Sequence, residues 1–299
     1  MRRAKRMLRA VMSEPEDHRV AGAVTQPLAI TSVHDPVHVV AVRRWDVHGT
    51  RNTSDAVAEE TPVALTYHGV PHVVMLATPQ DLEDFAVGFT LSEALVSDAS
   101  EIRGVEVQAG PLAIDVRVRI DAQRFSALLQ QRRNLTGRTG CGLCGAETLD
   151  QALRTAPALQ GRVMVSIDDL HGSLAELAAL QPLNSRTGSV HAAAWAVPGR
   201  GVQYVREDVG RHNALDKLIG ALVRADVDRN AGYVIITSRA SYEMVLKSAT
   251  VGIAFLAAVS APTALAIRVA ERAGLTLVGF ARADQHVVYA HGERLKAAK

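Results

Sequence analysis

The sequence predicts an α/β protein in which an N-terminal α+β unit precedes a region where strands and helices alternate. Residues 114–120 alternate strictly between apolar and polar side chains, which is typical of a half-buried strand. After about Met164, short apolar strands alternate with amphipathic helices, and this pattern indicates a sheet covered on both faces. With 48% hydrophobic and 21% charged residues, the 299-residue chain can form a large core.

The first half of the chain carries strand and helix signals in close succession. We expect strands at residues 39–45, 62–67 and 72–77, the last two joined by a turn through Gly69, Val70 and Pro71. Asp81 and Asp121 are each placed to cap a helix. The apolar residues that define these two helices are Leu82, Phe85, Ala86 and Phe89 in the first, and Phe125, Leu128 and Leu129 in the second.

The second half alternates more regularly. A strand at 163–167 precedes a helix capped by Asp168 or Asp169, and strands 192–197 and 202–205 form a hairpin. Gly274 stops the last helix at the position where a left-handed residue is favoured. The remaining predicted elements are helices at 212–223, 242–257 and 263–273 and strands at 233–237, 275–281 and 287–289.

These signals divide the chain into four parts. Residues 1–37 are predicted to be a disordered leader, 38–137 an N-terminal α+β domain, 138–160 a mobile loop and linker, and 161–299 a C-terminal α/β domain. The basic start runs into acidic residues, so it resembles no secretory signal, and the longest apolar stretch, 251–259, is too short to span a bilayer. The net charge of +2 indicates no nucleic-acid partner. We therefore expect a cytoplasmic protein that binds neither membrane nor nucleic acid.

Both cysteines of the chain lie in one glycine-framed hexapeptide, residues 140–145. Cys141 and Cys144 are three positions apart, and Arg132, Arg133 and Arg138 precede them. Arginines favour the thiolate, which is the nucleophilic form of cysteine, and glycines let another molecule approach the backbone closely. A packing cysteine is normally surrounded by large apolar residues, which are missing here. The hexapeptide is therefore the first candidate for thiol chemistry.

Other interpretations of the cysteine pair remain open at this point. The pair could be half of a structural zinc site, although such a site normally needs four ligands and the chain has no second cysteine pair. It could also form a structural disulfide or a thioredoxin-like redox pair, but the latter should follow a strand and open a helix. The pattern alone does not choose among these chemistries.

Polar residues also cluster at two predicted strand-to-helix junctions, 207–212 and 237–241. Ligands of α/β sheets bind beyond the carboxyl ends of strands, close to helix N-termini that favour phosphates. Arg211 and Arg239 at these junctions therefore predict an anion site. In the alternative interpretation, Asp208 and Ser241 only cap helices and residues 243 and 247 form a solvated ion pair. His191, which enters a predicted strand, is interpreted as a structural histidine.

Several motifs together resemble one protein family, the formate dehydrogenase accessory sulfurtransferases, known as the FdhD family. The resemblance covers roughly residues 59–297, and its motif set is specific. The segments that carry it are RTGCGLCGAE (138–147), HAAAW (191–195), EDVGRHNALDK (207–217), SRASYEMVLK (238–247) and LTLVGF (275–280), together with the stretch 59–95.

The resemblance implies a function for the cysteine pair. A cysteine desulfurase would hand sulfur to Cys141 as a persulfide, with Cys144 as the second thiol. The sulfur would then pass to the molybdenum of bis(molybdopterin guanine dinucleotide), the substrate, before the cofactor enters the catalytic subunit of formate dehydrogenase. The resemblance further implies a cytoplasmic homodimer and a C-terminal domain with a cytidine-deaminase-like α/β/α three-layer fold and a mixed sheet.

The same resemblance implies which residues bind the cofactor. Asp284 and Gln285 depart from the usual pattern of this segment, and a carboxylate repels an anion, so Arg282 is the best candidate for a direct phosphate contact. The segment that the resemblance implies is Phe280, Ala281, Arg282, Ala283, Asp284 and Gln285, and the two junctions add Arg211, His212, Ser238 and Arg239 to the expected cofactor-binding set.

Deaminase chemistry is not expected, and neither is a permanently bound metal. Zinc deaminases use a glutamate two positions after a histidine, whereas Ala193 occupies that position after His191. Two other functions remain as alternatives: a cofactor-binding chaperone that passes no sulfur, and a dithiol redox or zinc module.

Overall fold

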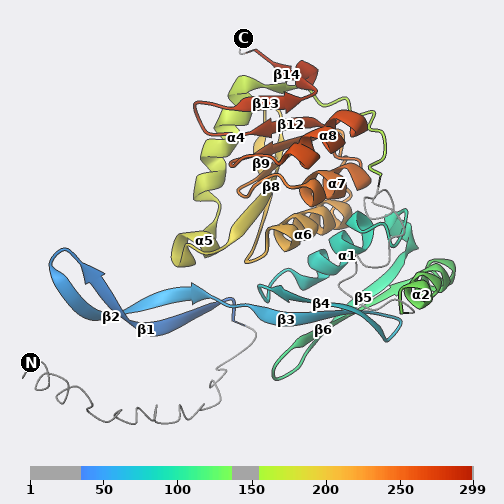
Figure 1. Cartoon of the computed structure of the whole chain (residues 1–299), viewed down its shortest axis with the longest axis horizontal. Coiled ribbons are helices and arrows are strands. Elements are labelled where there is room, and N and C mark those ends of the chain that lie inside the picture. Colours follow the sequence, from blue (N-terminus) through green and yellow to red (C-terminus); the bar gives the residue numbers. More distant parts are fainter. Residues whose placement is uncertain (1–34, 137–154, 298–299) are drawn as a thin grey trace, which may run out of the picture. The chain divides into compact units, whose positions relative to one another are not determined.

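The computed structural model describes residues 35–136 and 155–297 (Figure 1). Its strands pair into two larger sheets, one of four strands and one of six, and two small two-stranded ones. The elements of the first range are β1 (Val37–Asp46), β2 (Gly49–Ala58), β3 (Thr61–Tyr67), β4 (Val70–Ala77), α1 (Leu82–Ser92), a 3-10 turn (Ala99–Glu101), β5 (Ile102–Ala109), β6 (Ile114–Ile120) and α2 (Ala122–Thr136).

The first two strands form a long antiparallel hairpin. Its register runs without interruption from Val37 opposite Ala58 to Asp46 opposite Gly49. At its base, Val37 and Ala58 pack with Leu183. The strand predicted at 39–45 is confirmed as part of β1, whereas β2 was not predicted because residues 49–55 are polar or small and give no apolar alternation.

The four-stranded sheet has the order β4-β3-β6-β5. The alternation at 114–120 is confirmed, since the four odd-spaced apolar residues of β6 are buried and its polar residues are not. The turn before β4 lies one residue earlier than predicted, at His68 and Gly69, which have φ angles of 51° and 80°. Pro71 belongs to β4 instead, and it is tolerated there because β4 is an edge strand.

Asp81 precedes α1 as predicted, but it does not cap the helix with its side chain. Its own φ is 53°, and its side chain makes no capping hydrogen bond. Gly88 of α1 faces α6 so closely that a Cβ at this position would lie 1.7 Å from the Asp216 carbonyl oxygen. A Cβ added at Gly220 of α6 would likewise lie 1.9 Å from the Asp84 carbonyl oxygen. The two helices therefore cross with their backbones in contact.

The second described range contains the remaining elements. They are β7 (Val165–Ser166), α4 (Ile167–Ala179), α5 (Pro182–Thr187), β8 (His191–Val197), β9 (Gly201–Asp208), α6 (Arg211–Arg224), β10 (Tyr233–Ile236), α7 (Tyr242–Thr250), β11 (Phe255–Ala258), α8 (Ala264–Ala273), β12 (Thr276–Gly279), β13 (Val287–Ala290), a 3-10 turn (Gly292–Arg294) and β14 (Leu295–Lys296).

The six-stranded sheet has the order β13-β12-β11-β10-β8-β9 and is mixed. The neighbours β10, β11 and β12 run parallel, while the pairs β12–β13, β10–β8 and β8–β9 are antiparallel. One face packs on apolar residues of α6, α7 and α8, and the other on Leu170, Leu174 and Leu177 of α4. The α/β class and the sheet covered on both faces are confirmed; the cytidine-deaminase-like topology stays a prediction.

Two predicted helix boundaries are wrong. The helix predicted at 242–257 ends at Thr250, and Gly252, with φ of 82°, leads into β11. The apolar run that suggested a long helix is a strand buried in the parallel part of the sheet, which periodicity does not distinguish from a buried helix. The helix predicted to begin at Asp168 or Asp169 begins at Ile167, and its N-cap is Ser166, whose side chain accepts a hydrogen bond from the Asp169 amide.

The predicted domain boundaries stay predictions. Most of the predicted leader (1–37) lies outside the described residues. The same holds for most of the predicted cysteine loop (138–160). Among the helices of the described ranges, none is long and apolar enough to cross a membrane.

Candidate functional site

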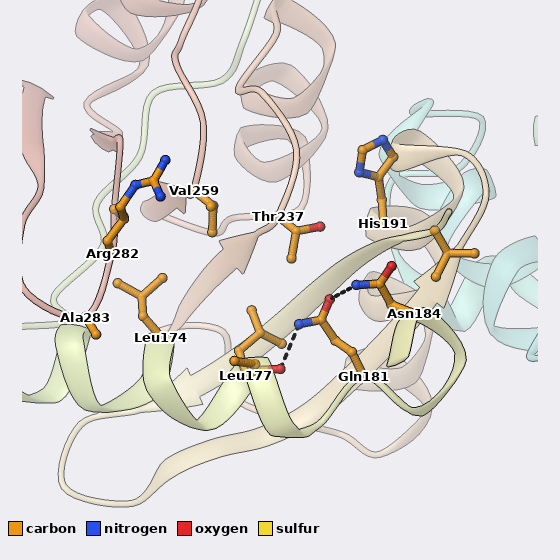
Figure 2. A pocket seen from close by; sticks show the side chains of 12 residues that line it. Leu174, Leu177, Gln181, Asn184, His191, Thr237, Val259, Arg282 and Ala283 are labelled. Carbon is orange, nitrogen blue, oxygen red and sulfur yellow. Dashed lines mark hydrogen bonds between the residues drawn. The ribbon is translucent and has the colours of Figure 1, made fainter. Parts of the chain in front are cut away.

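A pocket of about 390 Å³ lies beyond the carboxyl ends of the three parallel strands. Residues after β10, β11 and β12 contribute Thr237, Val259 and the segment 281–283, while α4 supplies the apolar wall. Figure 2 shows Arg282 and His191 at opposite ends of this pocket, with Val259 and Thr237 between them. This edge of an α/β sheet is where small ligands bind most often.

The polar groups of the pocket wall are held in place by hydrogen bonds to the backbone. The Thr237 hydroxyl accepts a hydrogen bond from the Ala192 amide at 2.9 Å. The Gln181 amide donates to the Leu177 carbonyl at 2.8 Å, at the end of α4. The Arg282 amide donates to the Gln285 carbonyl at 2.8 Å, which closes a tight turn and leaves the Arg282 side chain exposed. The pocket thus combines apolar walls with one free guanidinium.

His191 begins β8 and lines the pocket rather than being enclosed in the core. Burial lowers the pKa of its imidazole, the Arg211 guanidinium acts in the same direction, and the Asp208 carboxylate opposes both. Arg211 is therefore close enough to influence the pocket electrostatically. An anion bound between His191 and Arg211 would raise the pKa of His191 again.

The junction between β9 and α6 is built on a buried ion pair. Lys217 Nζ lies 2.7 Å from Asp208 Oδ2, and both side chains are fully buried. Asp208 also accepts hydrogen bonds from the amides of Thr78 and Gly210, at 3.0 and 2.7 Å. The interpretation of Asp208 as a helix cap is wrong, because Gly210 holds the N-cap position of α6. Asp208 instead fixes the backbone turn that precedes Arg211.

The starts of α6 and α7 lie side by side and carry unsatisfied polar atoms. His212 Nε2 at the start of α6 lies 2.7 Å from Glu243 Oε2 in α7. Ser241 holds the N-cap position of α7, as expected, but its side chain makes no capping hydrogen bond. Arg211 Nε and Ser241 Oγ are buried without a hydrogen-bond partner among the described residues. Buried polar atoms without a partner are uncommon, and an ordered water or a bound anion would satisfy these two.

The predicted ion pair between Glu243 and Lys247 is wrong. Glu243 pairs with His212, and Lys247 is buried against Asp216, at 2.8 Å, and Glu93, also at 2.8 Å. The Lys247 ammonium additionally donates to Ser92 Oγ at 3.0 Å. This lysine therefore links α7, α6 and the end of α1 and does not face solvent.

The structure brings only part of the predicted cofactor-binding set into the pocket. Ala281, Arg282 and Ala283 line it. Phe280 and Gln285 line an adjacent hollow of about 320 Å³ that shares Arg282. Asp284 is exposed and lines neither.

The predicted residues of the two junctions lie outside the lining of both hollows. Arg211 and His212 stand at the start of α6, and Arg211 influences His191 as described above. Ser238 is buried and donates to the Arg239 carbonyl at 3.2 Å, and the Arg239 side chain is exposed.

The sequence analysis missed the polar residues that the start of α5 contributes. Gln181 and Asn184 line the pocket and are linked by a hydrogen bond of 3.5 Å (Figure 2). They are distant in sequence from the strand ends that form the other wall, and neither belongs to a motif. The one signal available was Pro182, which marks a helix start close to His191 in sequence.

The cysteine pair is not placed by the structure. Cys141, Cys144 and Arg138 lie outside the described residues, which resume at 155 after α2 ends at Thr136. Within 35–136 and 155–297, no group of three or more histidine, cysteine, aspartate or glutamate side chains could hold a metal ion.

Comparison with known proteins identifies the family. The sequence profile described as FdhD/NarQ family matches residues 58–296. The chain belongs to the FdhD/NarQ family. It is 49% identical over 286 residues to a protein of Cupriavidus necator named sulfur carrier protein FdhD, covering 95% of this chain and 96% of that one. A protein of the same name from Xanthomonas euvesicatoria is 52% identical over 257 residues, covering 86% and 92%.

A solved structure agrees with this membership. A crystal structure from Desulfotalea psychrophila is described as that of a putative formate dehydrogenase accessory protein. It superposes on this chain with a TM-score of 0.71 at 26% sequence identity. The match covers 88% of this FdhD/NarQ chain and all of the other. The fold is thus that of the family, and the pocket lies within the matched range.

Proposed function

We propose that this chain is a sulfur carrier that serves formate dehydrogenase. The observation that carries the proposal is its similarity, at about half of all positions and over nearly its whole length, to proteins named sulfur carrier protein FdhD. The glycine-framed pair Cys141 and Cys144 gives the chain the thiols that such a function needs. In the cytoplasm, a cysteine desulfurase would supply the sulfur.

The loading step is a thiolate displacement. Cys141 as thiolate attacks the outer sulfur of the donor's persulfide, the donor's S–S bond breaks, and the donor cysteine leaves as thiolate. The new persulfide on Cys141 holds the transferred sulfur, and no external oxidant or reductant is consumed. Arginines near the pair, Arg132, Arg133 and Arg138 in sequence, favour the anionic forms of both thiol and persulfide.

The second thiol gives a balanced release step. When Cys144 attacks the inner sulfur of the Cys141 persulfide, a Cys141–Cys144 disulfide forms and the outer sulfur leaves as hydrosulfide. The two cysteines supply the two electrons that reduce the sulfur. The molybdenum of bis(molybdopterin guanine dinucleotide), as substrate, receives the sulfur before the cofactor enters the catalytic subunit of formate dehydrogenase.

The pocket supports a guanine dinucleotide as the part of the substrate that is bound. Its apolar wall and the amides of Gln181 and Asn184 suit a nucleobase, and the exposed Arg282 guanidinium suits a phosphate. The orphan donors Arg211 Nε and Ser241 Oγ lie at helix N-termini, which favour anions. A homodimer would offer two such sites to the two halves of a bis-pterin ligand.

Intact-mass analysis tests the proposal. After incubation with a cysteine desulfurase and cysteine, the parent chain should carry a one-sulfur adduct that dithiothreitol removes. The C141A variant should carry none and should still fold, while C144A should load sulfur and release it less completely. A parent chain that takes up no sulfur, or a C141A variant that loads normally, would contradict the proposal.

A further inference from the structure

Two histidines join the segment that carries Arg282 to helix α4. His286 follows the turn of residues 282–285, and its Nδ1 lies 2.9 Å from Nε2 of His171 in α4, which is a hydrogen bond. The two rings meet edge to face, with their centroids 5.1 Å apart. Because α4 also forms the apolar wall of the 390 Å³ pocket, this contact fixes the turn relative to that pocket.

His286 also lines the hollow of about 320 Å³ beside that pocket. The complete lining is Phe280, Arg282, Gln285, His286 and Val287. The imidazole of His286 and the guanidinium of Arg282 are thus two groups on one short segment that can both be cationic. None of the described residues that line the hollow carries a carboxylate. This combination of donors suits a phosphate, which forms its strongest hydrogen bonds with charged donors.

The contact with His171 decides which nitrogen of His286 is available to a ligand. Nδ1 is engaged by His171, while Nε2 has no hydrogen-bond partner within residues 35–136 and 155–297. His171 itself does not line the hollow. A ligand in the hollow would therefore meet Nε2 of His286, and His171 would act on that ligand only through His286.

The histidine pair can carry one positive charge and keep its hydrogen bond. When both rings are neutral, one nitrogen donates and the other accepts. When His286 is protonated, its Nδ1–H donates to neutral His171, and its Nε2–H remains to donate to an anion. A second proton on the pair would set two N–H groups against each other and break the contact. The pair is therefore suited to taking up a single proton.

Charged groups reach His286 from both elements that pack around it. The turn supplies Arg282 and Asp284, both exposed, and α4 supplies His171 and, one turn earlier, Asp168. Strand β13, which follows His286, contributes no side chain that is charged at neutral pH. Burial lowers the pKa of His286, and a charge on His171 acts in the same direction. The ring is thus mostly neutral at pH 7 until an anion next to it raises its pKa.

We propose that His286 is a second phosphate contact beside Arg282, that His171 positions it, and that the pair takes up one proton from solvent when a nucleoside diphosphate binds. The hydrogen bond between the two rings and the shared lining of the hollow carry the proposal. It deepens the proposed function and rests on the guanine dinucleotide site of that proposal. Neither histidine belongs to a motif that the sequence analysis singled out.

Calorimetry with guanosine diphosphate and the full chain tests the contact. His286→Gln keeps a neutral N–H donor but takes up no proton. It should bind roughly tenfold more weakly than the parent at about pH 6, and within about threefold of the parent at about pH 8, because charged donors bind phosphate more strongly. The ratio of variant to parent cancels the titration of the ligand's own phosphate. His48→Gln, an exposed histidine at the tip of the β1–β2 hairpin, is the matched control and should bind like the parent.

Proton NMR measures the proton uptake directly. The C2–H resonance of His286 is assigned by its loss in His286→Gln. Its pKa should lie below 6.5 in the free chain and rise by about 1–3 pH units when guanosine diphosphate binds. His171→Phe keeps a ring in place but removes the acceptor, so this rise should shrink. His171→Gln, whose side-chain oxygen accepts a hydrogen bond, should restore it, which a purely structural role would not predict.

Two results would overturn the inference and leave sulfur transfer untouched. If His286→Gln binds as tightly as the parent at about pH 6, or if the pKa of His286 does not change on binding, His286 is not a phosphate contact. A parent chain that binds no guanosine diphosphate would overturn the nucleotide site along with this inference. Sulfur loading, measured separately by intact mass, should be the same in His286→Gln as in the parent, so the two failures are distinguishable.

Discussion

Lys247 of α7 and Asp216 of α6 form an ion pair of 2.8 Å in which both side chains are almost completely excluded from solvent. Burial raises the pKa of Asp216, while Lys247 and the Ser92 hydroxyl act in the opposite direction. Burial would lower the pKa of Lys247, but the Asp216 and Glu93 carboxylates outweigh it and raise the pKa. The two residues are 2.8 Å apart, and with Ser92 and Glu93 they tie α1 to the helices that begin at the candidate site.

Removing one partner of this pair should destabilise the protein strongly. In Lys247→Met, Asp216 would remain buried with only the Ser92 hydrogen bond, which should cost roughly 3–5 kcal/mol of unfolding free energy. Replacing both residues, as Lys247→Met with Asp216→Leu, should recover much of that loss, because the buried charge of Asp216 is removed as well and Glu93, the other partner of Lys247, is partly exposed. Urea denaturation of the single and double variants measures both effects. A single variant as stable as the parent would show that the pair is unimportant.

The helix crossing at Gly88 gives a second test of stability. In Gly88→Ala the new methyl would meet the backbone of α6, which does not yield as a side chain would, so we expect a loss of roughly 1–3 kcal/mol or more. Gly172→Ala in α4 is the matched control, because no atom lies within 4 Å of the added Cβ. That substitution should stabilise the chain by about 0.5–1 kcal/mol through helix propensity. Equal thermal stability of the two variants would contradict the close crossing.

The elements predicted correctly are those whose side-chain pattern matches their burial. The alternation of β6 and the pair Thr263 and Gly274 at the ends of α8 are local signals, and the structure keeps both. β2 escaped prediction because an exposed strand has no apolar face to reveal it. β11 escaped because a buried parallel strand and a buried helix have the same composition over a few residues.

The site was harder to predict because it depends on tertiary contacts. Asp208 was interpreted as a helix cap and Lys247 as part of a solvated ion pair, whereas the structure buries both side chains. Their partners include Thr78 for Asp208 and Asp216 for Lys247, which only the folded chain brings close. Arg282 was found because its segment follows a strand and resembles a family motif. Gln181 was not found, since only folding brings the start of α5 to the strand ends.

Stability should fall as the pH drops through about 6.5, the ordinary pKa of histidine. Burial lowers the pKa of His191 and of His212, so between the folded-state values and 6.5 the unfolded chain binds more protons than the folded one. The folded state is favoured above this window, and the loss levels off below it. Urea denaturation across mildly acidic pH should show this slope, and His191→Gln should reduce it. An unchanged slope in His191→Gln would remove this histidine as a source.

Guanosine diphosphate should bind in the pocket with Arg282 as its main charged contact. A charge-assisted hydrogen bond to phosphate contributes about 1.5–3 kcal/mol, so Arg282→Ala should weaken binding roughly 10- to 100-fold. Arg239 was expected from sequence to contribute as much, but it lies outside the pocket lining, so Arg239→Ala should weaken binding less. Asp284→Gly, which removes an exposed carboxylate from the same turn, is the control and should bind as tightly as the parent or more tightly. Calorimetry with the full chain measures all three variants. If Arg282→Ala binds as tightly as the parent, the phosphates lie elsewhere, and a large loss in Arg239→Ala alone would move them to the start of α7.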